Sequence, residues 1–326
     1  MLHQRRSLIA EAILLVMVVA ACSSGGEQPD APPATTEADM PRASIAFVTH
    51  QVPGDTFWDL VRRGAEAAAA KDNLELRYSH DPDAADQANL VRSAIDQKVA
   101  GIVVTLAEPQ VMSPAVQAAV AAGIPVVAVN SGIADWKAMG VLGYFGQDEF
   151  IAGQAAGERF TQRGAKNVLC VIHEPGHVGL EARCAGVEKG FTGKTQKLYV
   201  DGVDRSTVKA AVLAKLQQDF SIDRVLTLGA PIALAALEAV GEANSYAKIA
   251  TFDTNADVVD AIKNGMVAWA VDQQPFLQGY LAVDSLWLYL TNKNVIGGGH
   301  PTLTGPSFVD ESNIDSVSYL AEAGTR

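Results

Sequence analysis

The sequence predicts an α/β protein made of two doubly wound, Rossmann-like lobes with parallel sheets. From residue 43 onward, short runs of β-favouring residues alternate with segments of helical periodicity, and the alternation restarts after residue 146. The runs at 101–106 and 124–129 are apolar nearly throughout, which is typical of strands buried on both faces of a parallel sheet. With 326 residues, the chain is long enough for two domains of about 130 residues each.

The first series of elements follows from the periodicity between residues 43 and 145. Strands are expected at 45–48, 74–78, 101–106 and 124–129. Helices are expected at 57–70, 89–99 and 114–122. The last of these helices should begin at a proline, which suits a first turn, and end at Gly123.

The second series repeats the architecture without repeating the sequence. Helices are expected at 149–163, 179–190, 207–219 and 232–240. Strands are expected at 168–172, 197–200, 224–228 and 249–252. Two consecutive series of this kind indicate two sheets, each with its own helices.

The end of the chain predicts that the lobes are not simply consecutive. A strand at 267–272, a long helix at 276–290 and a strand near 307–309 would be surplus in a second lobe. They fit if the chain crosses back and returns, giving one lobe from 43–145 plus 275–303 and another from 146–273 plus 304–326. Three segments would then form a hinge, as in binding proteins that close around a ligand.

The first residues read as an export signal. Arg5 and Arg6 precede an apolar run at 8–21, which is too short for a comfortable membrane span. The string ending in Cys22 resembles the bacterial lipobox, which predicts that residues 1–22 are a lipoprotein signal peptide and that Cys22 is acylated. An ordinary cleaved signal peptide is the alternative. Residues 23–42, poor in large apolar side chains, should be a flexible tether that holds an extracytoplasmic protein at the membrane.

Charge excludes one class of partner, and the cysteine content suggests a disulfide. The formal net charge is −12, which disfavours nucleic acid because nucleic-acid binding requires basic patches. We expect a monomer without a cofactor. In an exported chain, Cys170 and Cys184 are candidates for a disulfide, with two buried thiols as the alternative.

One segment looks catalytic. Residues 173–177 read His-Glu-Pro-Gly-His, which matches the zinc-protease string. That motif requires a helix, whereas Pro175 and Gly176 favour a loop directly after a strand. The two cysteines have no evident base, and no phosphate-binding glycine loop is present. The sequence therefore predicts no metal site and no enzyme.

Several stretches, taken in order, carry a resemblance to a known family. They lie at 53–59, 64–65, 123–127, 146–148, 179–186, 251–253 and 272–279. Together they resemble the ribose/galactose-type periplasmic binding proteins along residues 44–310. The resemblance implies a two-lobe fold whose cleft closes over a sugar.

The resemblance also implies the residues at the lips of the cleft. They are Asp55, Phe57, Trp58, Asn130, Arg183, Asp253 and the hinge residue Gln273, with His50 and His177 as further candidates. Each lies at or just past the carboxyl end of a strand, where open α/β sheets bind ligands. Rings suit the C–H face of a sugar, while Asp, Arg, Asn and Gln suit its hydroxyls.

Each candidate also has a purely structural explanation. Phe57 and Trp58 could be hydrophobic staples of the first helix. Asp253 could simply be the N-cap of the helix that follows it. Arg183 could pair with Glu181 on the surface, and the residues after Asn130 could merely form a turn.

The chain departs from the ribose-binding pattern at two places. Residues 229–231 read Gly-Ala-Pro where ribose binders carry Asn-Asp, and Asn130–Ser131 replaces an Asp-Arg pair. We therefore expect a sugar or polyol other than ribose, delivered to the permease subunits of an ABC importer. A capture protein for a chemoreceptor or sensor kinase is the alternative, and an enzyme on this scaffold is a third hypothesis.

Overall fold

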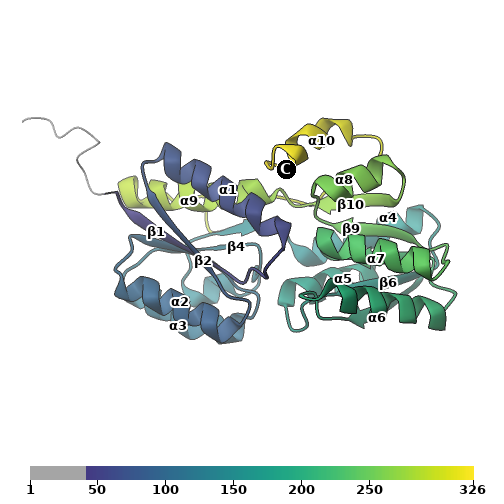
Figure 1. Ribbon diagram of the computed structural model, residues 1–326. Coiled ribbons are helices and arrows are strands. Elements are labelled where there is room, and N and C mark those ends of the chain that lie inside the picture. Colours follow the sequence, from purple (N-terminus) through teal and green to yellow (C-terminus); the bar gives the residue numbers. More distant parts are fainter. Residues whose placement is uncertain (1–41) are drawn as a thin grey trace, which may run out of the picture. The chain divides into compact units, whose positions relative to one another are not determined.

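The computed structural model describes residues 42–326 (Figure 1). The predicted signal peptide 1–22, the acylated Cys22 and the tether up to residue 41 lie outside the described residues. Elements β1 to β12 and α1 to α10 follow one another within residues 42–326.

The first lobe contains a six-stranded sheet in the order β11-β5-β4-β3-β1-β2. All of its neighbouring strands are parallel. The strands are β1 (Ser44–Thr49), β2 (Glu75–His80), β3 (Gly101–Thr105), β4 (Val126–Val129), β5 (Tyr144–Gly146) and β11 (Thr302–Leu303).

The second lobe contains a six-stranded sheet in the order β12-β10-β9-β8-β6-β7. Its strands are β6 (Asn167–Ile172), β7 (Lys194–Tyr199), β8 (Arg224–Thr227), β9 (Lys248–Phe252), β10 (Val267–Asp272) and β12 (Ser307–Val309). The edge strand β12 runs antiparallel to β10, and the other pairs are parallel. The two orders match position by position, so β1 corresponds to β6 and β4 to β9.

Helices cover both faces of each sheet. In the first lobe, α1 (Thr56–Lys71) and α9 (Pro275–Asn292) lie on one face, and α2 (Ala84–Asp96) and α3 (Pro109–Ala121) lie on the other (Figure 1). In the second lobe, α4 (Glu149–Gln162) and α5 (Val178–Gly190) share one apolar core. The opposite core contains α6 (Arg205–Gln218), α7 (Ala230–Glu242), α8 (Ala256–Lys263) and α10 (Asp315–Glu322).

The chain passes between the two sheets three times. It does so between β5 and α4, between β10 and α9, and between β11 and β12. The predicted fold class, two doubly wound lobes joined by three strands, is confirmed. The residue boundaries 43–145 with 275–303 and 146–273 with 304–326 remain the assignment that we propose.

The structure corrects the element prediction in several places. Helix α3 begins at Pro109 and contains Pro114 in its interior, because Pro109 already supplies the favourable first-turn proline. Helix α2 begins at Ala84, capped by the side chain of Asp83, five residues before the expected start. Elements β5, β11, α8 and α10 were not assigned residue ranges in advance, since each spans eight residues or fewer.

Two helix pairs are packed so closely that their backbones touch. In α1 and α9, a Cβ added to Gly64 or Gly279 would lie well under 3.0 Å from a carbonyl oxygen of the other helix. In α4 and α5, a Cβ added to Gly153 or Gly186 would likewise lie well under 3.0 Å from a carbonyl oxygen of the other helix. Only glycine permits this approach, so these four positions fix how each pair of helices is seated on its sheet.

A disulfide joins Cys170 in β6 to Cys184 in α5. It ties the strand to the helix that covers it, and both sulfurs are buried in the apolar core. The alternative of two free thiols is therefore not what the structure contains.

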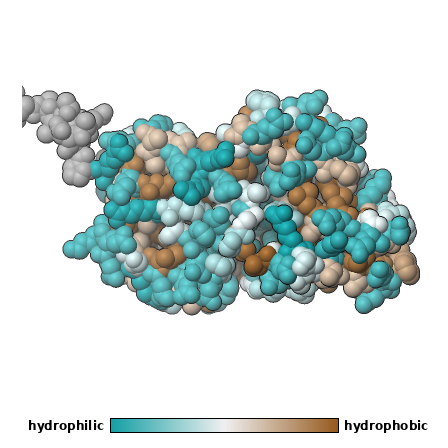
Figure 2. All heavy atoms as spheres, in the orientation of Figure 1, coloured by the Kyte–Doolittle hydropathy of each residue, from teal (hydrophilic) through white to brown (hydrophobic). Residues whose placement is uncertain are grey.

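The surface is predominantly polar on the face drawn in Figure 2, where hydrophobic residues occur in separate groups. None of the helices within residues 42–326 is both long and apolar enough to cross a bilayer.

Candidate ligand-binding cleft

Two neighbouring cavities, which share part of their lining, lie between the strand ends of the lobes. The inner cavity has a volume of about 30 Å³, and the outer one about 460 Å³. Both cavities are bordered by His50, Asp55, His173, Glu174, His177 and Gly229. The inner cavity is lined by all of the sequence-predicted candidates, His50, Asp55, Phe57, Trp58, Asn130, His177, Arg183, Asp253 and Gln273. The sequence thus predicted where these side chains lie, whereas their contact with a ligand stays a prediction.

Matching strands of the two lobes supply matching positions. His50 follows β1 as His173 follows β6, and Asn130 follows β4 as Asp253 follows β9. Asn130 and Asp253 both have a φ of 65°, in the left-handed region that Asn and Asp tolerate better than most residues. The turn that this conformation makes places both side chains in the inner cavity.

Aromatic side chains form the first-lobe wall. Phe57 and Trp58, at the start of α1, pack edge to face with ring centroids 5.0 Å apart. Trp58 also meets the ring of His50 edge to face at 4.8 Å. Asp55 caps α1 by accepting from the backbone N–H of Phe57 at 3.0 Å, so the helix cap and the ring pair are placed together.

Arg183 is held by a partner that the sequence did not reveal. Its guanidinium donates to both carboxylate oxygens of Glu149, at 2.6 and 2.9 Å, and to the carbonyl of Leu228 at 2.9 Å. The pair is buried, with both side chains 4% exposed. The alternative pairing with Glu181 is wrong, because Glu181 binds Lys197 instead.

A chain of hydrogen bonds runs across the hinge. The amide of Asn130 donates to the side-chain oxygen of Gln273 at 3.3 Å, and the amide of Gln273 donates to Asp253 at 2.8 Å. Gln278 in α9 also donates to the Gln273 oxygen, at 2.9 Å. Asn130 of the first lobe is therefore connected to Asp253 of the second lobe through the hinge residue Gln273.

His177 caps the second-lobe helix α5. Its Nδ1 accepts from the backbone N–H groups of Gly179 and Leu180, at 3.0 and 3.3 Å. Burial lowers the pKa of His177 well below its usual value, so the ring is neutral and its single proton lies on Nε2. That Nε2 is 3.3 Å from the hydroxyl of Ser131, which in turn donates to Asn130 at 2.8 Å.

Three carboxyl groups in the cleft have raised pKa values. Burial raises the pKa of Asp55 to about 6, that of Asp253 to about 7 and that of Glu174 to about 8. Arg183 works against these shifts at all three groups, and the neighbouring carboxyls add to them. Hydrogen-bond donors of a ligand would stabilise these buried carboxyl groups, because they would replace the water that burial has removed.

The structure also allows the zinc interpretation to be tested. Residues 173–176 form a bend and a turn rather than a helix, so the zinc-protease geometry is absent from this segment. Within residues 42–326, His50, Glu174 and His177 form one group whose potential ligand atoms lie within 4.8 Å of one another. A metal needs a ring nitrogen with a free lone pair. At His177 the Nδ1 lone pair is used by the cap and Nε2 carries the proton, so this group does not suit a metal.

Sequence reasoning missed His173 and Glu174, which line both cavities, and Ser131 and Glu149, which hold cleft residues in place. Glu149 and Arg183 are 34 positions apart, and nothing in their spacing indicates the pair. His173 could have been found, because it follows β6 as His50 follows β1. Glu174 was seen only as part of the zinc-protease string.

The two sheets, the triple crossing and the cavity at the strand ends define a two-lobe α/β binding protein. Residues 45–294 match the family model described as "Periplasmic binding protein domain". The chain therefore belongs to this family, which confirms the resemblance.

Relatives and solved structures agree with this assignment. A carbohydrate transporter from Acidothermus cellulolyticus 11B, solved in complex with myo-inositol, is 57% identical with a TM-score of 0.87, over 88% of this chain and 100% of that one. The xylose/arabinose-binding protein of Sulfolobus acidocaldarius is 26% identical, over 85% of this chain and 73% of the relative. The ribose import binding protein of Bacillus subtilis is 25% identical, over 73% of this chain and 79% of the relative.

Proposed function

We propose that this protein is the extracytoplasmic solute-binding subunit of an ABC importer and that it binds a cyclic polyol of the myo-inositol type. The observation that carries the proposal is the inner cavity, where both lobes contribute hydrogen-bonding groups beside an aromatic wall. Each hydroxyl of a polyol can donate and accept, which matches a mixture of carboxyl, amide, guanidinium and imidazole groups. The 57% identity to a protein solved with myo-inositol supports this ligand class.

Binding requires the lobes to move. The inner cavity, at about 30 Å³, has room for only about two water molecules, so a six-membered ring does not fit there. Opening at the three crossings would separate Asn130 from Gln273 and admit the ligand. Hydroxyls would then replace bonds that these side chains now make with one another, and closure would shield them from water.

The remaining parts of the proposal concern partners and location. We place the protein outside the cytoplasm, held by a lipid on Cys22, where it delivers its ligand to membrane permease subunits as a monomer. We assign it no catalytic step, cofactor or nucleic-acid partner. Nothing in residues 42–326 favours the sensor alternative.

Titration calorimetry tests the ligand class. We expect the purified protein to bind myo-inositol and to bind ribose at least tenfold more weakly, because a mismatched ring leaves buried polar groups unpaired. A thermal-shift screen over inositols, pentoses and linear polyols gives the same ranking, since a ligand at 100 times its Kd stabilises the protein by about 2.7 kcal/mol.

A matched pair of variants tests the place of binding. Asp253→Ala removes a buried cleft carboxyl, whereas Asp257→Ala removes an exposed one in the first turn of α8. We expect only the first to weaken binding. A protein that binds no polyhydroxylated compound, or an Asp253→Ala variant with unchanged affinity, contradicts the proposal.

A further inference from the structure

The hydrogen bonds around His50 fix which of its nitrogens carries the proton. The hydroxyl oxygen of Thr105 accepts from the backbone N–H of His50 at 3.1 Å and from the side-chain amide of Gln87 at 2.8 Å. The Gln87 amide nitrogen also donates to the Thr105 carbonyl at 3.1 Å, which fixes its orientation. Both lone pairs of the hydroxyl are thus occupied, and its proton is directed to Nδ1 of His50, 2.7 Å away.

The proton of the neutral His50 ring therefore lies on Nε2, which leaves this N–H without an acceptor. The nearest polar atom is Nε2 of His177, at 3.2 Å, and the cap of α5 places a proton there as well. Two N–H groups that face each other form no hydrogen bond. His177 has another acceptor in the hydroxyl of Ser131, whereas His50 has none among the hydrogen-bonded partners of residues 42–326.

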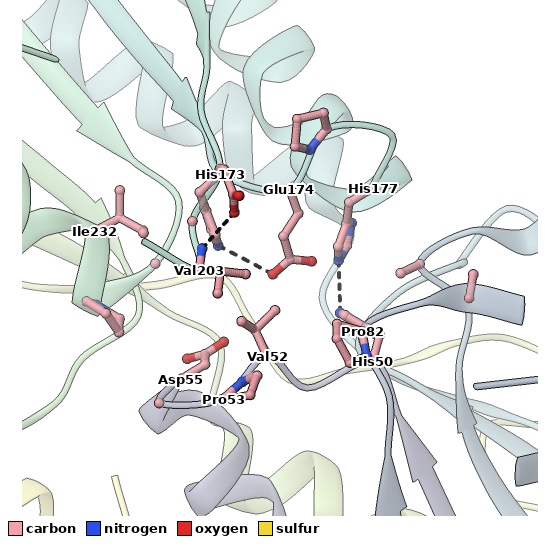
Figure 3. A pocket seen from close by; sticks show the side chains of 18 of the residues that line it. His50, Val52, Pro53, Asp55, Pro82, His173, Glu174, His177, Val203 and Ile232 are labelled. Atoms are coloured by element: carbon pink, nitrogen blue, oxygen red, sulfur yellow. Dashed lines mark hydrogen bonds and ion pairs between the residues drawn. The ribbon is translucent and has the colours of Figure 1, made fainter. Parts of the chain in front are cut away.

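Glu174 offers the complementary group from the opposite lobe. Figure 3 shows its side chain extending into the pocket between His173 and His177. No side-chain hydrogen bond within residues 42–326 involves its carboxyl, whose nearest charged or titratable partner is Nε2 of His173 at 3.7 Å. It borders both cavities, as does His50.

The two groups are close enough for a single bridging oxygen. The potential ligand atoms of His50, Glu174 and His177 lie within 4.8 Å of one another. Two atoms that each hydrogen-bond to one tetrahedral oxygen at about 2.8 Å stand roughly 4.6 Å apart. A hydroxyl between His50 and Glu174 could accept from the first and donate to the second.

We propose that His50 and Glu174 bracket one free hydroxyl of the ligand, with the Nε2–H of His50 donating to its oxygen and a carboxyl oxygen of Glu174 accepting a hydrogen bond from its O–H. The inference rests on the proposed function and sharpens it: the ligand carries an unsubstituted hydroxyl at the border that the two cavities share. His177 is a positioning residue, which orients Ser131 and Asn130 rather than the ligand. A deoxy carbon at this place leaves both groups unpaired, whereas an ether oxygen still accepts from His50 and leaves only Glu174 without a donor.

A cycle that combines protein variants with altered ligands tests the bracket. Calorimetry would measure the affinity of the wild-type protein, Glu174→Met and His50→Phe for myo-inositol and for its monodeoxy analogues. We expect one analogue to bind the wild-type protein at least tenfold more weakly than myo-inositol. Each variant should lose a similar factor with myo-inositol and bind that one analogue no worse than myo-inositol, because the hydroxyl and the bracket act as one unit.

Two further variants keep the test independent of folding defects. Glu174→Gln keeps the shape of the side chain and should weaken binding by a smaller factor than Glu174→Met, since its amide oxygen still accepts. Glu188→Gln, on the exposed face of α5, should bind like the wild type. If the wild type binds myo-inositol but the variants lose equal affinity for every analogue, or none, the bracket is wrong and the proposed function stands. A wild-type protein that binds no cyclic polyol overturns both.

Discussion

The helix pairs α1–α9 and α4–α5 occupy matching places in the two lobes and hold the two halves of the cleft. Helix α1 begins with Asp55, Phe57 and Trp58, and α5 begins after His177 and carries Arg183. In both pairs glycines let the backbones touch, so the site residues are placed by the same packing device.

The pairs differ in how the chain connects them. Helices α4 and α5 are consecutive, and the disulfide Cys170–Cys184 additionally ties α5 to the sheet. Helices α1 and α9 are far apart in the sequence, because most of the second lobe lies between them, and neither helix contains a cysteine. The first-lobe half of the cleft therefore depends on non-covalent contacts, among them the ion pair of Lys71 with Asp284, whereas the second-lobe half is also cross-linked.

Substituting the contact glycines should have the largest effect. Gly64→Ala and Gly153→Ala each place a Cβ against a backbone oxygen of the other helix, so the helices must separate. We expect each to lower the free energy of unfolding by about 3 kcal/mol, measured by urea denaturation. The two lobes should respond alike.

Gly241→Ala is the matched control. Gly241 lies near the end of α7 with no atom within 4 Å of an added Cβ, so the substitution should be neutral or stabilise by up to about 1 kcal/mol. If Gly64→Ala behaves like this control, the close approach of α1 and α9 is not what seats them.

Removing the disulfide should affect one lobe only. The double variant Cys170→Ala/Cys184→Ala opens a loop of about 15 residues, for which the chain-entropy model gives about 3 kcal/mol. We expect hydrogen exchange to quicken in β6 and α5 and to remain unchanged in β1 and α1. Reduced wild-type protein should match the variant, and equal changes in both lobes would contradict the comparison.

The smallest expected effect is a pH dependence that differs between the cleft walls. Burial raises the pKa of Glu174 from 4.5 to about 8, so its contribution to stability is present below pH 4.5 and is lost as the pH rises toward 8. Glu174→Gln abolishes this loss, and the variant should gain in melting temperature relative to the wild type between pH 5 and 8. Because the Glu174 side chain is 24% exposed, water screens this effect, and the gain in free energy of unfolding should stay well below the limit of about 1.4 kcal/mol per pH unit.

His50, on the opposite wall, should show the reverse slope. Burial and the neighbouring His173 lower its pKa from 6.5 to about 3, so stability is present above pH 6.5 and is lost as the pH falls. His50→Gln should therefore gain relative to the wild type on acidification below pH 6.5. Parallel pH profiles for the two variants would show that the walls are electrostatically alike.

The sequence predicted the fold and the place of most candidate residues because both follow from strand ends; Arg183 is the exception, since it lies within α5 and not at a strand end. Apolar runs located the central strands, and a residue just past such a run, such as Asn130 or Asp253, must face the cleft. Partners could not be predicted in the same way. The pairing of Arg183 with Glu149 depends on how α4 packs against α5, and the opposed protons of His50 and His177 depend on Thr105 and a helix cap.

The left-handed backbone at Asn130 and Asp253 limits how this protein could adapt to other nutrients. Most side chains would cost about 1–2 kcal/mol in that conformation, so exchanging either residue penalises the fold before any ligand is met. Gly229 borders both cavities with an extended backbone, and an added Cβ would stand 3.3 Å from the His173 ring. New specificities should therefore arise more readily at positions with an ordinary backbone, such as Gly229 once the His173 ring shifts slightly, while Asn130 and Asp253 stay unchanged.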